Sequence, residues 1–177
     1  GNDVDFLGIG YSPTLNCLVG GGDSSSGTYN YNQMSYSTNA TSWSLVNTSY
    51  DLSYRSMIWV DSLNLFIACG TISNKQIMSS PDGKTWTQQT TPTPYSALYG
   101  ITYASSLSLL VCVGTNIIIT SPDGINWTSR TAASGNAWSG LAWSPSLSIF
   151  VAVSSSGAGG RVMTSTNGIN WTGRTIT

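Results

Sequence analysis

The stretch Ser121-Pro122-Asp123-Gly124-Ile125-Asn126-Trp127-Thr128 recurs along the chain and decides its fold. Close copies occupy residues 80–87 and 165–172, and a weaker copy occupies residues 37–44. The tryptophans of the four copies follow one another at intervals of 43, 41 and 44 residues. Repetition at a fixed period of this length indicates an array of similar supersecondary units. The sequence therefore predicts a single array over residues 1–177 made of four units.

Composition excludes several classes of function. Only 7% of the residues are charged, with six Lys and Arg against seven Asp and Glu, so no basic surface is available for nucleic acid. No apolar run is long enough to span a membrane as a helix, and no charged leader precedes a hydrophobic stretch. The chain has no His, and its three Cys lack metal-ligand spacing, so we expect no metal, no cofactor and buried free thiols.

Apolar and small residues alternate with period two at the start of each unit, as on a strand with two different faces. In the third unit Ile101 and Tyr103 mark one face and Gly100 the other. The equivalent residues are Ile9, Tyr11 and Gly8 in the first unit, Met57, Trp59 and Ser56 in the second, and Leu141, Trp143 and Gly140 in the fourth. The small residues predict close approach of neighbouring backbones.

Three more strands complete each unit. A short apolar run such as residues 109–112 predicts a strand buried on both faces. A third strand leads into the repeated motif, and a fourth begins at its Trp. We therefore predict an all-β fold of four four-stranded antiparallel blades, approximately 5–48, 54–91, 97–132 and 138–177, stacked radially as a β-propeller or a propeller segment. Each blade is complete within its unit, so ring closure needs packing of the first blade on the last, or another chain.

The repeated motif has a mechanical interpretation. Asp and Asn side chains accept hydrogen bonds from backbone N–H groups two residues on, and Gly supplies a positive φ, so the motif sets a tight turn. The Ser hydroxyl ties the strand end to the turn, and the Trp ring is expected between adjacent sheets. The residues assigned to this structural role are Ser37, Asn39, Trp43, Ser80, Asp82, Gly83, Trp86, Ser121, Asp123, Gly124, Trp127, Ser165, Asn167, Gly168 and Trp171.

At these residues the sequence resembles the Asp-box, or BNR, repeat of sialidase-like β-propellers. The resemblance covers all four units, although the motif is one residue shorter than the usual spacing and Ala40 replaces the Gly in the first unit. The family includes glycosidases, lectins, receptor ectodomains and assembly factors, so the resemblance indicates a fold more than a function. It also implies that the Asp-box turns lie on the face away from the binding site.

The chain does not carry the residues that sialidase chemistry would need. That chemistry, as the family performs it, uses an arginine cluster for the substrate carboxylate, a tyrosine nucleophile and an acidic proton donor. Of the four arginines, which include Arg161, Arg130 and Arg174 occupy matching outer-strand positions, and only Arg55 starts an inner strand from which it would point into a central cleft. Apart from the motif aspartates Asp82 and Asp123, no two acidic residues occupy symmetric positions that suggest a glycosidase pair. We therefore predict no catalytic residues.

Aromatic and polar residues in the loops between blades are the candidate ligand-binding site, because aromatic faces stack on sugar rings or on protein side chains. The alternative is that Tyr54 and Trp138 close the core at the ends of strands. The candidates are Tyr50, Asp51, Tyr54, Arg55, Tyr95, Asn136 and Trp138.

Three functional hypotheses follow. The first is a non-catalytic recognition module, extracellular or on a particle surface, that binds glycans through the face opposite the Asp-box turns. Low charge, Gly/Ser-rich loops at 20–33 and 154–161, and sequons at Asn39, Asn47, Asn126 and Asn170 are consistent with it. The second is a structural scaffold that binds other protein chains in a fibre, tail or envelope, as a homo-oligomer or a larger assembly. The third is a fragment of a sialidase-like glycosidase.

Overall fold

The computed structural model describes residues 5–23, 33–48, 53–71, 76–92, 97–157 and 160–175. These residues form four four-stranded antiparallel sheets, each in sequence order. The first sheet holds β1 (Asp5–Ser12), β2 (Cys17–Asp23), β3 (Gln33–Ser37) and β4 (Ser44–Asn47); the second holds β5 (Ser53–Val60), β6 (Leu65–Thr71), β7 (Ile77–Ser80) and β8 (Thr87–Gln89); the third holds β9 (Leu98–Ala104), β10 (Leu109–Gly114), β11 (Ile117–Ser121) and β12 (Thr128–Arg130); the fourth holds β13 (Ala137–Ser144), β14 (Ile149–Ser156), β15 (Val162–Ser165) and β16 (Thr172–Arg174).

Short turns of 3-10 helix, η1 (Asp61–Leu63) and η2 (Ser105–Leu107), follow β5 and β9. Among the described residues, none belongs to a helix that has both the length and the apolar character for crossing a bilayer.

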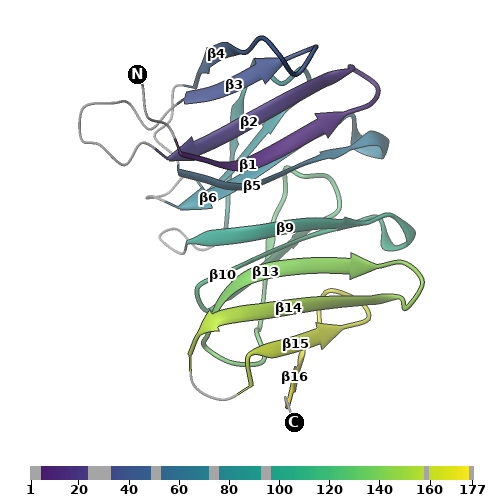
Figure 1. Cartoon of the computed structure of the whole chain (residues 1–177). Coiled ribbons are helices and arrows are strands. Elements are labelled where there is room, and N and C mark those ends of the chain that lie inside the picture. The colour runs from purple at the N-terminus through teal and green to yellow at the C-terminus, as the bar shows by residue number, and fades with distance from the viewer. Residues whose placement is uncertain are drawn as a thin grey trace.

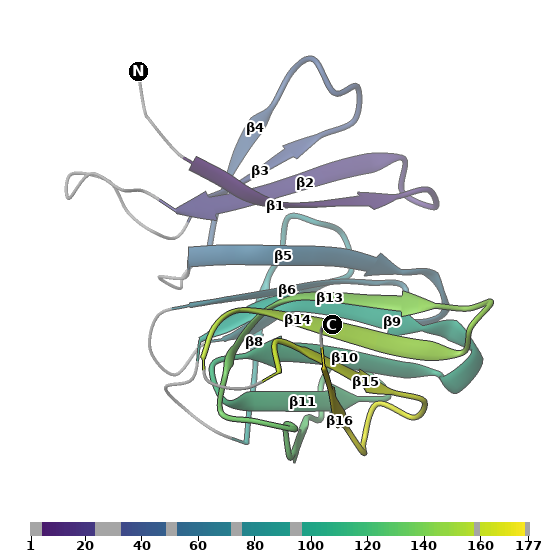
Figure 2. The same ribbon diagram turned by 60° about the horizontal axis from the view of Figure 1, so that its bottom comes forward.

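The sheets follow one another along a curved array. Neighbouring sheets pack through their first strands, β1 against β5, β5 against β9 and β9 against β13. Figure 1 places β5 and β9 between β1 and β13, and Figure 2 also shows β5 between β1 and β13, so the first sheet and the last lie at opposite ends of the array. The all-β architecture of four antiparallel four-stranded units predicted from the repeat is therefore confirmed.

Apolar side chains on both faces of the middle sheets make the core. In β6, Phe66 packs toward the first sheet with Val19 and Met34, while Ile67 packs toward the third sheet with Leu110. A third cluster between the third and fourth sheets contains Val111, Val113, Ile118, Trp138, Phe150 and Met163. Since each middle sheet is covered twice, its strands need continuous apolar runs, as the sequence has.

Small residues allow the innermost strands to approach each other closely. A Cβ added to Gly8 would lie 3.2 Å from the backbone nitrogen of Ser56 in the next sheet. One added to Gly100 would lie 3.5 Å from the backbone nitrogen of Leu141. These contacts confirm the close approach that the sequence predicted for this face.

The three cysteines, Cys17, Cys69 and Cys112, are free thiols buried inside the array, as expected. Burial raises the pKa of the Cys112 thiol well above its ordinary value, so it stays protonated and behaves as a small apolar side chain.

Candidate functional site

The repeated turn closes on itself through hydrogen bonds. In the third sheet, Ser121 Oγ accepts from the backbone N–H of Gly124 at 2.8 Å. Asp123 Oδ1 accepts from the backbone N–H groups of Ile125 and Asn126 at 2.9 and 2.8 Å, and Trp127 Nε1 donates to the carbonyl oxygen of Gly124 at 3.2 Å. The same set recurs around Asn39, Asp82 and Asn167. These hydrogen bonds are the ones expected of a tight turn, but the ring of Trp43, which was expected between adjacent sheets, is 43% exposed on the first sheet.

Glycine in this turn also makes room for the neighbouring sheet. Gly83, Gly124 and Gly168 have φ of 74°, 74° and 71°. A Cβ added to Gly124 would lie 2.8 Å from Ile67 Cδ1 of the second sheet, and one added to Gly83 would lie 2.7 Å from Val19 Cγ2 of the first. Each turn therefore packs on the second strand of the preceding sheet, at a distance that only glycine permits.

The turn carboxylates are held in their charged form. Burial alone would raise the pKa of Asp123, but hydrogen bonds from the backbone and side chain of Asn126, the backbone of Ile125 and the hydroxyl of Ser121 outweigh it and hold this pKa well below its usual value. Burial also opposes ionisation of Asp82, and the N–H groups of Thr85 and Lys84 overcome it to lower that pKa. Both carboxylates therefore act as charged hydrogen-bond acceptors within their own turns.

Three of the candidate binding residues lie in the core. Tyr54 is fully buried, and its hydroxyl is hydrogen-bonded to Thr48 Oγ1 at 3.0 Å. Trp138 is fully buried and donates from Nε1 to the carbonyl oxygen of Ser134 at 3.2 Å. Asn136 is buried and donates from Nδ2 to the carbonyl oxygen of Gly160 at 3.1 Å. These side chains present no open face to a ligand. The structure therefore favours the alternative stated for Tyr54 and Trp138, that they close the core at the ends of strands.

Of the remaining four candidates, only Arg55 lies among the described residues. Arg55 is half-buried at the start of β5. Tyr50, Asp51 and Tyr95 lie outside the described residues.

The outer-strand arginines are structural. Arg130 Nε donates to Thr120 Oγ1 at 3.0 Å, and Arg174 Nε donates to Thr164 Oγ1 at 2.8 Å. In the second sheet Gln89 Nε2 donates to Ser79 Oγ at 2.8 Å from the matching position. Among the described residues, no group of three or more Cys, Asp or Glu is placed to hold a metal ion.

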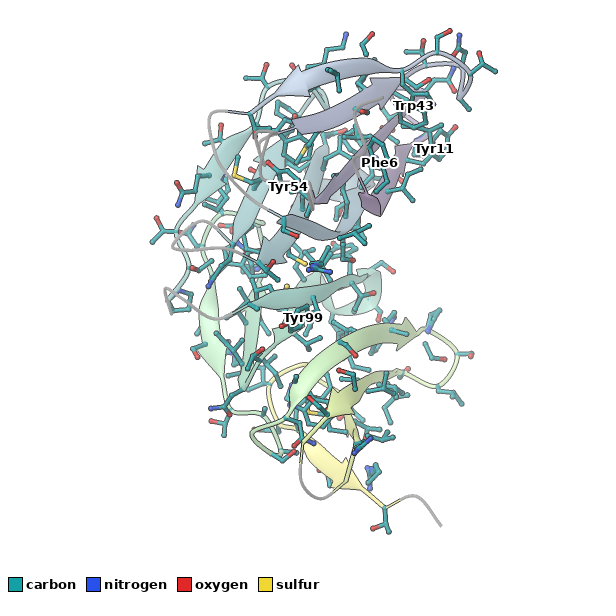
Figure 3. All side chains as sticks on the ribbon, turned by 60° about the vertical axis from the view of Figure 1, so that its left-hand side comes forward. Phe6, Tyr11, Trp43, Tyr54 and Tyr99 are labelled. Carbon is teal, nitrogen blue, oxygen red and sulfur yellow. The ribbon has the colours of Figure 1, made fainter. Side chains whose placement is uncertain are left out.

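An exposed apolar surface covers the outward side of the first sheet. We call it the leading face, and register and repeat position assign to it Phe6, Ile9, Tyr11, Leu18, Trp43 and Leu45. Phe6, Ile9, Tyr11 and Trp43 are 56, 62, 52 and 43% exposed. Figure 3 shows Phe6, Tyr11 and Trp43 grouped on this sheet.

The same repeat positions are buried in the sheets that have a predecessor. Tyr54, Met57 and Trp86 are the second-sheet counterparts of Phe6, Ile9 and Trp43, and all three are buried against the first sheet. The sequence showed the apolar alternation at Ile9 and Tyr11 but not its exposure. That exposure depends on the position of the first unit, because no other sheet among the described residues packs on its outward side.

Comparison with known proteins gives structural neighbours only. No protein-family model matches the sequence, and no curated protein matches it significantly. Virginiamycin B lyase from Staphylococcus aureus has a TM-score of 0.78 at 15% identity, over 98% of this chain and 56% of that chain. A catalytically inactive variant of the same lyase, with one histidine replaced by alanine and solved with quinupristin, has a TM-score of 0.80 at 14% identity, over 99% of this chain and 57% of that one.

A nidogen/laminin complex is a third neighbour, with a TM-score of 0.69 at 16% identity over 93% of this chain and 61% of that chain. The chain thus spans between half and two thirds of the length of these neighbours. The likeness shows the fold, and the class it defines is the β-propeller, of which this chain forms four consecutive blades.

Proposed function

We propose that this chain is a non-catalytic recognition and assembly module that binds another folded polypeptide through the leading face. The observation that carries the proposal is the exposure of Phe6, Ile9, Tyr11 and Trp43 at repeat positions that following sheets bury. Contiguous apolar surface of several hundred Å² is uncommon on monomers and marks interaction sites. A large aromatic side chain that stays half-exposed is available as an anchor for a partner.

Protein chains are better supported as partners than glycans. Sugar sites combine an open aromatic face with convergent polar groups. The residues expected to provide these, Tyr54, Asn136 and Trp138, are buried, and each side chain is hydrogen-bonded inside the array. The leading face instead offers aromatic and aliphatic side chains without a charge, which suits an apolar protein surface. A nidogen/laminin complex among the neighbours supports protein binding for this fold.

The non-catalytic part of the proposal rests on the side chains that this chain has. The neighbouring lyase becomes inactive when one histidine is replaced by alanine. This chain contains no histidine, so it does not itself supply that group. Its two outer-strand arginines are engaged with threonine hydroxyls of their own sheets, which supports a structural use of both.

Membership of the Asp-box family and a location outside a cell or on a particle are further parts of the proposal. The shared hydrogen-bond set of the four turns supports the first. A charged fraction of only 7% is consistent with the second.

Oxidative footprinting tests whether the leading face is covered in the native setting. Hydroxyl radicals would be applied to the protein in its native assembly and to the dilute purified chain, with mass spectrometry of Phe6, Tyr11 and Trp43. We expect these three rings to react several times more slowly in the assembly. Leu107 and Ile125, exposed on the third sheet, are internal controls with unchanged rates. Equal labelling of the leading face in both samples would overturn the proposal.

A further inference from the structure

The outward side of the last sheet is a second exposed apolar surface. Antiparallel register places Ile149, Val151 and Val153 of β14 on it, beside Ala142 of β13 and residues of β15. We call this surface the trailing face, and it consists of Ala142, Ile149, Val151, Val153, Val162 and Thr164. Val153 is 45% exposed. The face carries β-branched side chains, which pack well on a pleated surface.

Inner sheets present the same surface to their successors. The counterparts of Val153 are Cys69 in the second sheet and Val113 in the third, and both are fully buried under the next sheet. The counterparts of Val151 are Ile67 and Val111, which are also fully buried. The trailing face therefore matches a surface that, inside the array, is covered by the next sheet. The side of the next sheet that covers it has the same repeat positions as the leading face.

The trailing face has a groove. It lies at the position that, on an inner sheet, is occupied by the repeated turn of the following sheet. It has a volume of about 260 Å³, and its lining includes Ile149, Thr164 and Arg174. At the third interface the matching surface receives the turn of the fourth sheet, because a Cβ added to Gly168 would lie 2.8 Å from Leu109 and 3.0 Å from Val111. Leu109 and Ile149 occupy equivalent repeat positions.

We propose that the partner of the leading face is a second copy of this chain, which presents its trailing face, so that copies join head to tail. The inference rests on the proposed protein-binding role of the leading face and names its partner. The turn at residues 39–43 of one copy lies in the trailing groove of the other, as the turns of the second, third and fourth sheets lie on their predecessors. Such a heterologous contact closes into a two-copy ring if the array spans half a turn, and continues as a longer chain of copies if no number of copies completes the turn.

Charge and area are compatible with this contact. Among the described residues that line the groove, Arg174 is the only charged one, and its counterpart Arg130 lines a pocket together with Trp171 of the following sheet. Three half-exposed aromatic rings and two aliphatic side chains offer on the order of 500 Å² of apolar surface on the leading face. Because an interface buries a similar area on each partner, each contact buries on the order of 1,000 Å², at the low end of the range for specific interfaces, and a two-copy ring contains the contact twice.

One residue sets a limit on how tightly the copies fit. Ala40 occupies the glycine position of the first turn at φ 61°. The Cβ of Ala40 occupies the position of a Cβ added to the glycines of the other turns. Such a Cβ would lie 2.7 Å from Val19 Cγ2 when added to Gly83, and 2.8 Å from Ile67 Cδ1 when added to Gly124. Packing on Val151 of a second copy must therefore be a few tenths of an ångström looser here than inside the array. Ala40→Gly is expected to strengthen the association between copies.

Solution mass with complementary charge variants tests the inference. Ile9→Lys places a charge on the leading face and Val153→Lys places one on the trailing face, and each of these side chains is exposed enough for the sheets to tolerate the change. Ile125→Lys is the matched control, because Ile125 is equally exposed on the third sheet and the second sheet already has Lys84 at that turn position. The measurement is light scattering coupled to size exclusion on the purified chain, with near-ultraviolet circular dichroism as a check of folding.

We expect the parent chain and the Ile125 variant to show a mass of two or more copies of 18.7 kDa, and each face variant alone to be a monomer. An equimolar mixture of the two face variants keeps one intact leading face and one intact trailing face, so it is expected to recover a two-copy species. Tyr11→Ser replaces Ile9→Lys if the latter fails to fold.

Three results would overturn the inference. A monomeric parent chain at all accessible concentrations would exclude the second copy, while protection in the footprinting experiment would still uphold the proposed function with another partner. Dimers of the Val153 variant together with monomers of the Ile9 variant would show contact between two leading faces. Failure of the mixture to associate would exclude head-to-tail pairing.

Discussion

The first and third sheets have the same design and different surroundings. Trp127 and Ile101 of the third sheet are buried against the second sheet, while Trp43 and Ile9 occupy the same repeat positions and are about half exposed. Strand order and antiparallel pairing are the same in both sheets. The difference shows that the repeated sequence specifies the sheet, and that the neighbour decides what the sheet buries.

Comparison of the turns of these two sheets distinguishes two possible requirements for glycine in the motif, its positive φ and its close approach to a preceding sheet. Ala40 accepts a positive φ and keeps the hydrogen bonds, since its N–H donates to Ser37 Oγ at 2.9 Å, much as Gly124 donates to Ser121 Oγ at 2.8 Å. The hydrogen bonds therefore do not require glycine. Contact with a preceding sheet does require it, and among the four described turns the first is the one without that contact.

The largest expected difference concerns the two tryptophans. Trp127→Ala removes a buried ring between the second and third sheets and is expected to lower the free energy of unfolding by about 3–5 kcal/mol. Trp43→Ala removes a ring that is 43% exposed, and we expect a loss of roughly 1 kcal/mol. Urea denaturation extrapolated to low protein concentration measures both. Similar losses at the two positions would contradict the comparison.

Exchanging alanine and glycine at the turns should give effects of opposite sign. Gly124→Ala places a Cβ 2.8 Å from Ile67 at a positive φ and is expected to destabilise the chain by about 2–4 kcal/mol. Ala40→Gly relieves a left-handed alanine and is expected to stabilise it by roughly 0.5–1 kcal/mol, after the added freedom of the unfolded chain. Denaturation midpoints of the two variants report the signs directly. A destabilising Ala40→Gly would show that the alanine makes a favourable contact.

The smallest effect is a pH dependence that distinguishes Asp turns from Asn turns. Asp123 has a folded-state pKa below its unfolded value near 4, so its stabilisation is present above about pH 4 and is lost as the pH falls below it. Asn39 and Asn167 make the same backbone hydrogen bonds and do not titrate.

Asp123→Asn is therefore expected to lower the melting temperature slightly at pH 7 and to reduce its fall between pH 5 and pH 2.5. Differential scanning calorimetry across that range makes the measurement, with Asp82→Asn as a second example. An unchanged acid dependence in both variants would exclude these carboxylates as the cause.

Local pattern determined much of the fold. The turn at 121–128 contains its own Ser, Asp, Gly and Trp, so its geometry follows from residues adjacent in sequence. Period-two alternation gave the strands for the same reason. Four copies at a constant interval then required four similar sheets.

The candidate site was harder to predict because burial depends on residues that are distant in sequence. Trp138 follows a loop and begins a strand, a position that suits either a ligand or the core. The structure buries it in a cluster that includes Val113 and Met163, and neither of these residues is adjacent to Trp138 in sequence. The exposure of the leading face likewise depends on distant residues, since no other sheet among the described residues packs against it, and no pattern within the first unit indicates this.

Each sheet ends in a short strand at the rim of the array. The strands β8, β12 and β16 have three residues each and β4 has four. An open edge of that length offers few unpaired N–H and C=O groups, so it is a poor template for strand addition by a second molecule. Short edge strands thus disfavour fibrillar aggregation by backbone pairing between molecules. Association between copies is left to the leading and trailing faces at the two ends of the array.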